Sequence, residues 1–313
     1  MAIESKIQAN IPLAPHTTFK IGGSAKFYLE ASAPEELAEA VAWAKQKSEK
    51  YFILGGGSNL LVADKGFDGL IIKNNCNLIE WQDSEAKVES GAFLAKLVLE
   101  AAEKGYAGLE WAAGIPGTVG GAIRGNSGAY GSSIQHSIKT VSVLDPETNM
   151  AKDYSPDECK FAYRHSIFKE KNLLALSAVI KFQIGKIEEI RQTMAGHLAS
   201  RGETNPKEPN AGSVFKNFNF KELKELNPEL AMEAEKDGVV RGSRISSGWI
   251  ISRLGLKGKK IGGAMISYEH GNFIVNTGDA TAEDVLVLMS LVKQKVRVES
   301  KLQLENEIEY LDY

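Results

Sequence analysis

The chain has 313 residues, of which 43% are hydrophobic and 25% are charged, and its formal net charge is −3. These are ordinary globular values, so they exclude a mainly disordered chain and predict two or three domains. The near balance of 37 basic and 40 acidic residues argues against a broad basic surface for nucleic acid.

The N-terminal half alternates between predicted helices and predicted strands. Pro34 near the first turn, followed by two acidic residues, is typical of a helix start. Runs of β-branched and apolar residues indicate the strands. The predicted helices are residues 34–50, 92–104 and 187–201. The predicted strands are residues 51–54, 70–73, 140–144 and 174–182.

A polar stretch with two prolines, residues 204–210, predicts a loop or linker before the C-terminal part. The clearest helix beyond it begins at Thr281, which together with Asp284 resembles a capping box. Its apolar residues then follow at spacings of three and four, typical of one buried helix face. The other predicted elements are helices at 221–236 and 249–254, a loop at 238–247, and strands at 264–267, 273–276 and 302–311. The pattern predicts an α+β fold with two N-terminal subdomains, residues 1–74 and 75–186, and a C-terminal domain, residues 187–313.

Several common sites are excluded by missing motifs. The sequence contains no GxGxxG after a strand, no GxxxxGK[ST], no HExxH and no GxSxG. Cys76 and Cys159 form no CxxC or Cys/His cluster, so neither a disulfide scaffold nor a metal site is expected. The first residues lack the pattern of a signal peptide, and no run reaches about 18 apolar residues. We therefore expect a cytoplasmic protein without a membrane span.

Glycine is unusually frequent, with 30 residues, and it concentrates in two places. The first glycine loop, residues 55–62, reads Gly-Gly-Gly-Ser-Asn-Leu-Leu-Val, and the second glycine loop, residues 114–122, reads Gly-Ile-Pro-Gly-Thr-Val-Gly-Gly-Ala. Consecutive small residues can turn several backbone N–H groups toward one anion, and a diphosphate needs such donors with no Cβ in the way. Two tight turns explain the glycines of either loop equally well, but two such loops in one chain favour a dinucleotide.

Three polar features stand out elsewhere. Arg164 lies between apolar residues, so we expect it to be buried beside an anionic partner, with a structural salt bridge as the simpler explanation. Ser213 follows a glycine and precedes an apolar pair, which also fits an ordinary turn. Glu305 and Glu307 alternate with other residues, so they would share one face of a strand, or of an exposed edge strand.

Taken in order along the chain, these segments resemble the UDP-N-acetylenolpyruvoylglucosamine reductase family, and the resemblance runs nearly end to end. No single segment is decisive, but the ordered set is specific. Besides the two glycine loops, it rests on residues 15–23, 126–131, 163–168, 212–217, 255–258, 261–264, 273–276 and 304–307.

The resemblance implies an FAD-binding fold of the vanillyl-alcohol-oxidase type, made of residues 1–74 and 75–186, and a substrate-binding domain in residues 187–313. It implies noncovalent FAD, reduced by NADPH, and hydride transfer to the enolpyruvyl group of a UDP-sugar in peptidoglycan precursor synthesis. We further expect a monomer. No histidine or cysteine lies in either glycine loop, which agrees with noncovalent FAD.

The resemblance also assigns residue roles. Arg164 and Glu307 would stabilise the charge that spreads into the substrate carboxylate, and Ser213 would donate the proton. The implied FAD contacts are Gly55, Gly56, Gly57, Ser58, Asn59, Leu60, Gly114, Ile115, Pro116, Gly117, Thr118, Gly120, Gly121, Ala122, Asn126 and Gly128. The implied substrate contacts are Asn217, Arg244, Lys257 and His270.

The chain departs from the family pattern in places. Residues 201–206 lack the common Arg-Gln-Pro pattern, residues 220–243 align poorly, and the spacing of Arg164 and Ser213 matches the shorter subtype without a tyrosine-bearing loop. A flavin oxidase that uses oxygen, or a noncatalytic nucleotide-binding protein, remains as an alternative. Oxygen turnover without the UDP-sugar would favour the first, and binding without turnover the second.

Overall fold

The computed structural model describes residues 3–312, and the chain forms two compact units. The first unit comprises the chain up to Ile11, Ala25–Gly56 and Asp68–Gly202. The second comprises Pro12–Ser24, Gly57–Phe67 and the chain from Glu203 onward. The first glycine loop therefore carries the chain from one unit into the other. The three segments predicted from the sequence, residues 1–74, 75–186 and 187–313, were assigned to FAD and substrate binding, and this assignment stays a prediction.

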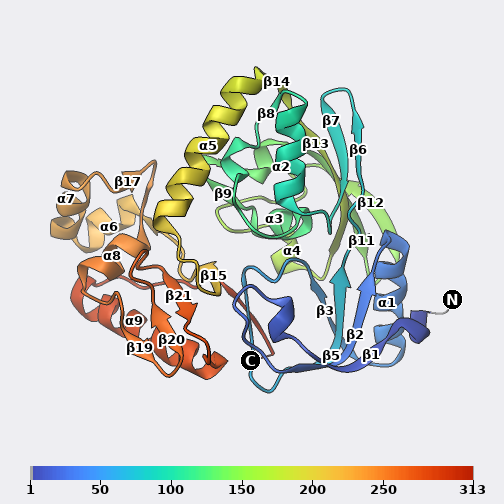
Figure 1. Ribbon diagram of the computed structural model, residues 1–313, viewed down its shortest axis with the longest axis horizontal. Coiled ribbons are helices and arrows are strands. Elements are labelled where there is room, and N and C mark those ends of the chain that lie inside the picture. Colours follow the sequence, from blue (N-terminus) through green and yellow to red (C-terminus); the bar gives the residue numbers. More distant parts are fainter. Residues whose placement is uncertain (1–2, 313) are drawn as a thin grey trace. The chain divides into compact units, whose positions relative to one another are not determined.

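Helices and strands mix throughout both units, which confirms the predicted α+β class (Figure 1). The helices are α1 Pro34–Gln46, α2 Leu94–Glu103, α3 Val119–Gly125, α4 Ile167–Glu170, α5 Ile187–Thr204, α6 Phe220–Leu226, α7 Pro228–Lys236, α8 Ser247–Arg253 and α9 Ala282–Ser300. Short 3-10 helices are η1 Ile3–Lys6, η2 Ala14–His16, η3 Glu110–Ala112 and η4 Ile134–His136. In the part of the chain that the structure covers, no helix combines the length and apolar character needed to cross a membrane.

The strands are short, and most of them lie in the first unit. These are β1 Gln8–Pro12, β2 Ser24–Ala31, β3 Lys50–Leu54, β5 Phe67–Asn74, β6 Ile79–Gln82, β7 Glu85–Glu89, β8 Tyr106–Ala107, β9 Gly128–Ala129, β10 Ser132–Ser133, β11 Ile138–Asp145, β12 Met150–Tyr154, β13 Leu174–Lys181 and β14 Gln183–Ile184. Those of the second unit are β4 Leu60–Val62, β15 Asn210–Ser213, β16 Phe218–Asn219, β17 Val240–Arg241, β18 Arg244–Ile245, β19 Lys260–Ile261, β20 Ala264–Ile266, β21 Phe273–Asn276 and β22 Glu309–Leu311.

The first unit has two sheets, each with its own hydrophobic core. The sheet β1-β2-β5-β3 packs against α1, where Leu37 and Val41 meet Leu70 and Ile72 of β5. Strands β3 and β5 are parallel, and Leu54, the last residue of β3, is followed directly by the first glycine loop. The sheet β12-β11-β13-β7-β6 is antiparallel and packs against α2 and α3, seen at the upper right of Figure 1. The second glycine loop runs directly into α3.

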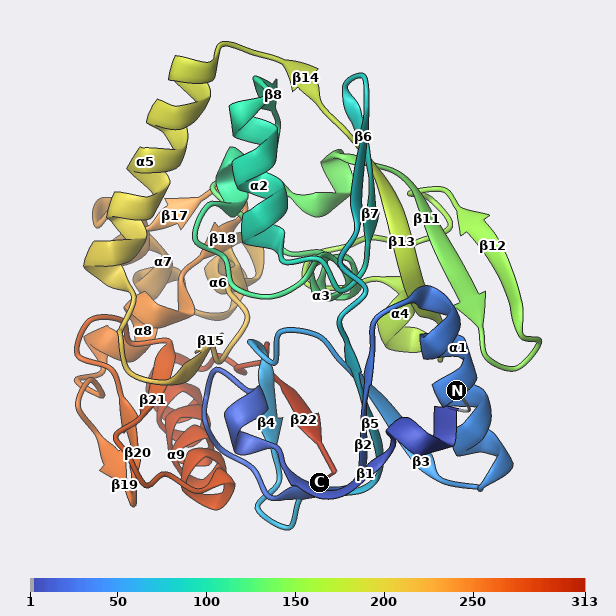
Figure 2. The same ribbon diagram turned by 45° about the vertical axis from the view of Figure 1, so that its right-hand side comes forward.

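The second unit is built around α9, whose apolar face is buried as the spacing predicted. The predicted capping box is confirmed: Asp284 N–H donates to Thr281 Oγ1, and Thr281 N–H donates to the Asp284 carboxylate, both at 3.1 Å. The sheet β15-β21-β20-β19 packs on this core, and β16-β18-β17 forms a smaller sheet. Strand β22 pairs in parallel with β4, and the two lie side by side in Figure 2.

Two predicted elements were wrong in extent. The single helix expected at 221–236 is two helices, because Asn227 caps the second through its side chain and Pro228 opens it. The strand expected at 302–311 is confined to Glu309–Leu311. Leu302 and Leu304 are buried between exposed neighbours, as the alternation of apolar and polar residues predicted. Before Glu309, however, the described residues of this stretch form only one isolated β-bridge, between Asn306 and Phe215.

Candidate functional site

The two glycine loops meet within the first unit. A Cβ on Gly55 would lie 2.6 Å from Thr118 Oγ1, and a Cβ on Gly56 would lie 2.7 Å from Gly117 Cα. Carbon atoms cannot approach this closely, so only glycine lets the two backbones come together. The missing side chains of Gly55 and Gly56 therefore bring the two glycine loops into direct contact.

The first turn of α3 is already committed to the fold. Val119 N–H donates to Ala92 O at 2.9 Å, Gly120 N–H to Ser90 O at 2.7 Å, and Gly121 N–H to Thr118 Oγ1 at 3.3 Å. The missing side chain of Gly120 is explained by its packing on Ser90, whereas Gly121 is exposed and a Cβ there would make only an ordinary contact. Donation from backbone N–H groups falls to positions ahead of Val119.

Asn126, an expected FAD contact, ends α3 in the left-handed conformation with φ 42°. Its side chain is buried, and its amide donates to Ala162 O at 2.9 Å and to Gln135 Oε1 at 3.0 Å. The first of these bonds ties the end of α3 to the tight turn that carries Arg164. Gly128 lies in the hairpin β9–β10, where a Cβ would stand 2.4 Å from Ser132 O.

Arg164 occupies a turn closed by two hydrogen bonds of 3.1 Å between the backbones of Ala162 and His165. Its own φ is 55°, an uncommon conformation for a residue with a side chain. Contrary to the expectation of a buried arginine, Arg164 is half-exposed, and its guanidinium lies over the Tyr163 ring at 5.2 Å. Ser166 Oγ donates to Arg124 O at 2.7 Å, so the turn is held to α3 from this side too.

Arg201, near the end of α5, is a residue that sequence reasoning missed. Its guanidinium lies 5.4 Å from the centre of the Tyr130 ring, and a Cβ on Gly114 would be 3.0 Å from its Cδ. Tyr130 in turn stacks on His197, with ring centres 3.8 Å apart. Arg201 Nε is buried, and within the described residues it has no hydrogen-bond partner.

The charge of Arg201 is unfavourable in its surroundings. Burial lowers the pKa of its guanidinium, and the charge of Arg164 lowers that pKa further, while Tyr130 acts in the opposite direction. Two cations that repel each other beside the second glycine loop favour an anionic ligand. No local pattern of the sequence singles out Arg201, because its position beside Gly114 depends on the packing of α5.

Ser213 ends β15, directly after an irregularity in its pairing with β21. Gly212 has φ 77°, and its N–H donates to Asn210 Oδ1 at 2.9 Å. The segment that follows Ser213 is clamped by Asn272, another residue that sequence reasoning missed. The buried Asn272 carboxamide accepts from Phe215 N–H at 3.0 Å and donates to Phe215 O at 2.7 Å, in the manner of a neighbouring strand.

The structure brings Glu307 to the Ser213 segment, since Glu307 N–H donates to Val214 O at 2.8 Å. Asn59, from the first glycine loop, donates to Glu307 O at 3.2 Å. Glu305 differs from Glu307: it is exposed, and its carboxylate lies 3.1 Å from Lys216 Nζ. The two glutamates therefore do not form one face of a strand.

The expected substrate residues gather around the same segment. Arg244 Nη1 donates to Asn217 O at 3.1 Å, and Asn217 Oδ1 accepts from Ser247 N–H at 3.2 Å. Burial lowers the pKa of His270, and the charge of nearby Lys257 lowers it further. Lys257 Nζ donates to Glu269 O at 3.3 Å. Arg244, Lys257 and His270 thus bring two cations and one polar ring to the second unit.

Neutral His270 has a defined tautomer. Its Nδ1 accepts from Asn272 N–H at 3.0 Å, so the hydrogen of the neutral ring is on Nε2. A Cβ on Gly248 would lie 2.6 Å from His270 Cε1, which explains why glycine is needed where the ring packs on α8.

The remaining expected FAD contacts divide by burial. Leu60 and Ala122 are buried, whereas Ser58, Ile115 and Pro116 are less buried and lie in the loops. Gly57 has φ 63°, and a Cβ there would meet His16 O at 2.4 Å. Leu60 begins β4, so its side chain supports the fold of the second unit.

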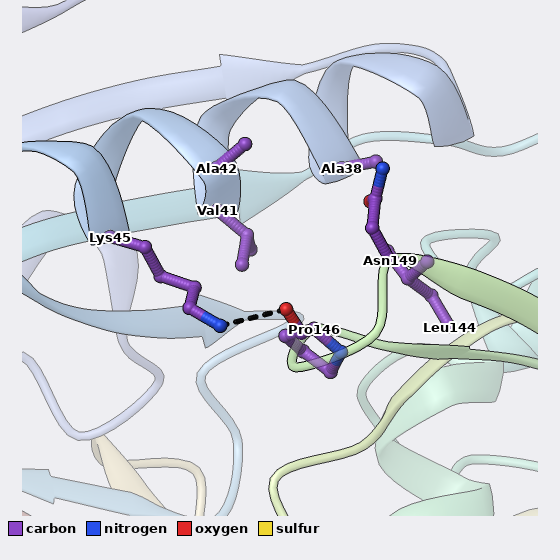
Figure 3. Close-up of a pocket in the computed structure, with 7 residues that line it drawn as sticks. All are labelled: Ala38, Val41, Ala42, Lys45, Leu144, Pro146 and Asn149. Atoms are coloured by element: carbon purple, nitrogen blue, oxygen red, sulfur yellow. Dashed lines mark hydrogen bonds between the residues drawn. The ribbon is translucent and has the colours of Figure 1, made fainter.

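A cavity of about 280 Å³ lies elsewhere in the first unit, between α1 and the turn from β11 to β12 (Figure 3). Val41 and Leu144 line it, and Lys45 Nζ donates to Pro146 O at 2.8 Å across its mouth. Lys45 is also paired with Glu147 at 3.0 Å. None of the predicted site residues, all of which the structure describes, lines this cavity.

Comparison with known proteins gives matches over nearly the whole chain. Residues 205–311 match the family described as UDP-N-acetylenolpyruvoylglucosamine reductase, C-terminal domain, and residues 25–152 match the FAD binding domain family. The UDP-N-acetylenolpyruvoylglucosamine reductase of Caldanaerobacter subterraneus is 37% identical over 97% of this chain and 93% of its own length. That of Syntrophomonas wolfei is 36% identical over 97% of this chain and 94% of its own. A crystal structure of the Thermus caldophilus enzyme of this name has a TM-score of 0.77 at 33% identity, covering 97% of this chain and 98% of that one.

Proposed function

Because the chain belongs to the UDP-N-acetylenolpyruvoylglucosamine reductase family, we propose that it reduces the enolpyruvyl group of UDP-N-acetylglucosamine enolpyruvate. The product is UDP-N-acetylmuramate, a precursor of peptidoglycan, and the electrons come from NADPH. The observation that carries the proposal is identity of 36–37% over 97% of the chain, together with the meeting of the two glycine loops. The monomeric state and the cytoplasmic location expected from the sequence remain part of the proposal.

FAD fits the first unit. Gly55 packs on the Thr118 side chain and Gly56 on the Gly117 backbone, which brings the backbones of both loops together where we propose that the diphosphate binds. The FAD binding domain match spans both loops. We assign the diphosphate to this surface and the neighbouring contacts to the other FAD residues named from the sequence. When bound, FAD supplies the hydride transfer from NADPH to the substrate.

The three proposed catalytic residues divide between the units. Arg164 belongs to the first unit, whereas Ser213 and Glu307 belong to the second and are held together through the Val214 backbone. A fixed cation such as Arg164 stabilises charge that develops on the substrate carboxylate. Ser213 would donate the proton to the neighbouring carbon, and Glu307 would share a proton with the carboxylate.

The substrate diphosphate is assigned to the second unit. Arg244 and Lys257 supply positive charge, and Asn217 supplies an amide whose backbone is fixed by Arg244. His270 serves as a neutral donor through Nε2, because Asn272 already occupies Nδ1. These contacts lie in the domain of residues 187–313 that the sequence assigned to substrate binding.

The test separates the two half-reactions. Under anaerobic conditions NADPH should bleach the yellow protein, and the enolpyruvyl UDP-sugar should restore the colour. Ser213→Ala should leave bleaching nearly intact and slow only the recovery, while Ser243→Ala, which alters an exposed serine of the same unit, should leave both steps unchanged.

Three outcomes would count against the proposal. A colourless protein that cannot bind FAD would remove the reductase function, and equal loss in both half-reactions would remove the role of Ser213 as proton donor. Rapid turnover with oxygen in the absence of the UDP-sugar would favour a flavin oxidase.

A further inference from the structure

Lys73, in β5, is a half-buried lysine beside the first glycine loop. Strand β5 runs parallel to β3, and the pairing places Lys73 opposite Leu54, the last residue of β3. The next residue along the chain is Gly55, and Lys73 Nζ donates to its carbonyl oxygen at 2.5 Å. The sheet therefore delivers a cation to the first peptide of the loop.

The ammonium group is not placed there to neutralise its nearest acidic neighbour. The Glu30 carboxylate accepts from the Tyr28 hydroxyl at 3.0 Å and from the Asn75 amide at 2.9 Å, whereas Lys73 donates to Gly55 O. Burial lowers the pKa of Lys73, and the charge of Glu30 opposes this only in part. A lysine is thus a costly way to satisfy one carbonyl, and an anion nearby would reduce that cost.

The bond to Gly55 fixes the direction of a neighbouring donor. In a trans peptide the C=O of one residue and the N–H of the next point in opposite directions. With the Gly55 carbonyl turned toward Lys73, the Gly56 N–H points away from it. Gly56 is also the residue whose missing side chain lets the loop approach Gly117.

Charge strengthens this arrangement. A charged donor on a carbonyl oxygen polarises the whole peptide, which makes the N–H at its other end a better donor. The positive charge of Lys73 also lies close to the first glycine loop, on the side of the Gly55 carbonyl oxygen. Both effects favour an anion on the side of the loop that faces away from Lys73.

We infer that Lys73 is a positioning residue for the FAD diphosphate, which it acts on through the Gly55–Gly56 peptide without touching it. The inference rests on the proposed use of FAD by the first glycine loop. The inference adds a lysine that lies outside both glycine loops, and it gives a reason for a positively charged side chain in the sheet.

The experiment measures FAD affinity rather than turnover. Apoprotein is titrated with FAD, and flavin fluorescence gives the dissociation constant for Lys73→Met, Lys73→Arg and the control Lys87→Met. Lys87 is an exposed lysine of β7 in the same unit, so its replacement makes the same change in net charge. Thermal unfolding of each apoprotein, followed by circular dichroism, reports whether the fold is intact.

Lys73→Met should weaken FAD binding by roughly tenfold to a hundredfold, because the Gly56 N–H loses its polarisation and the nearby positive charge is removed. Lys73→Arg should recover most of the affinity, and Lys87→Met should bind as the unchanged protein does. If Lys73→Met does not fold, Lys73→Arg becomes the test, and the inference predicts that this variant keeps most of the FAD affinity.

The inference is overturned if Lys73→Met folds and binds FAD within about twofold of the unchanged protein. It is equally overturned if the arginine variant binds as poorly as the methionine variant while its fold is intact. Failure of the unchanged protein to bind FAD would instead refute the proposed function, so the two failures are distinguishable.

Discussion

Gly120 and Gly121 are neighbours in α3, yet alanine at the two positions should change the free energy of unfolding in opposite directions. At Gly121 a Cβ would lie 3.6 Å from Thr118 Oγ1, an ordinary contact, and the residue is exposed. Alanine there gains helix propensity, because it orders less backbone on folding. We expect Gly121→Ala to stabilise the protein by about 0.5–1 kcal/mol.

Gly120→Ala gains the same propensity but loses more than it gains. Its Cβ would lie 2.8 Å from Ser90 O and 2.9 Å from Ser90 Cβ, against backbone that cannot rotate away. Overpacking of this kind costs about 1–3 kcal/mol. Moving α3 aside would also break the hydrogen bond of 2.7 Å from Gly120 N–H to Ser90 O, worth about 0.5–1.5 kcal/mol. The expected net loss is about 1–3 kcal/mol.

The assay is urea unfolding of the apoproteins, which keeps the stabilisation by bound FAD out of the comparison. FAD affinity is then measured separately. If the exposed face of Gly121 lies against FAD, Gly121→Ala should bind FAD more weakly although its apoprotein is more stable. Equal stability of the two variants would refute the assignment of Gly120 to packing and of Gly121 to an open surface.

Two further predictions concern cationic and titrating groups. Arg201→Lys keeps the charge but loses the buried Nε and the planar group over Tyr130. We expect kcat/KM to fall roughly tenfold to a hundredfold. The control Arg191→Lys, at an exposed position of the same helix, should have no effect. Equal activity of both variants would reduce Arg201 to a packing role. Because burial lowers the pKa of His270 below its usual value near 6.5, the unfolded chain binds more protons and stability should fall as the pH drops below about 6.5. His270→Gln, which keeps an acceptor for Asn272 N–H, should flatten this slope in urea unfolding measured across that range; an unchanged slope would contradict it.

Local patterns in the sequence predicted the elements whose cause is local. The helix that begins after Thr281 is an example, since its cap and its buried stripe both lie within one segment. The break between α6 and α7 also has a local cause, Asn227 followed by Pro228, but the charged composition of the region favoured a single helix. A proline preceded by asparagine was the signal that should have ended the first helix.

The missed site residues have causes that no local pattern contains. Asn272 matters because β21 places it against a residue 57 positions earlier in the chain, where its amide imitates a strand. Arg201 matters because α5 brings it to Gly114, and Lys73 because two parallel strands end together. Each depends on tertiary register, which a periodic pattern leaves open.

The first glycine loop illustrates how far a motif alone can be interpreted. The glycines predicted a backbone surface for an anion, which stays a prediction, and the structure shows that Gly55 and Gly56 pack against the second glycine loop. The following residues do something else: Asn59 donates to the carbonyl of Glu307 at 3.2 Å and accepts from Glu309 N–H at 2.9 Å, which joins β4 to β22. One loop thus contains the glycines proposed for FAD binding and, a few residues later, fixes the segment that carries the proposed proton-sharing Glu307. A change in Asn59 should therefore affect substrate reduction through Glu307 even where FAD binding is unaltered.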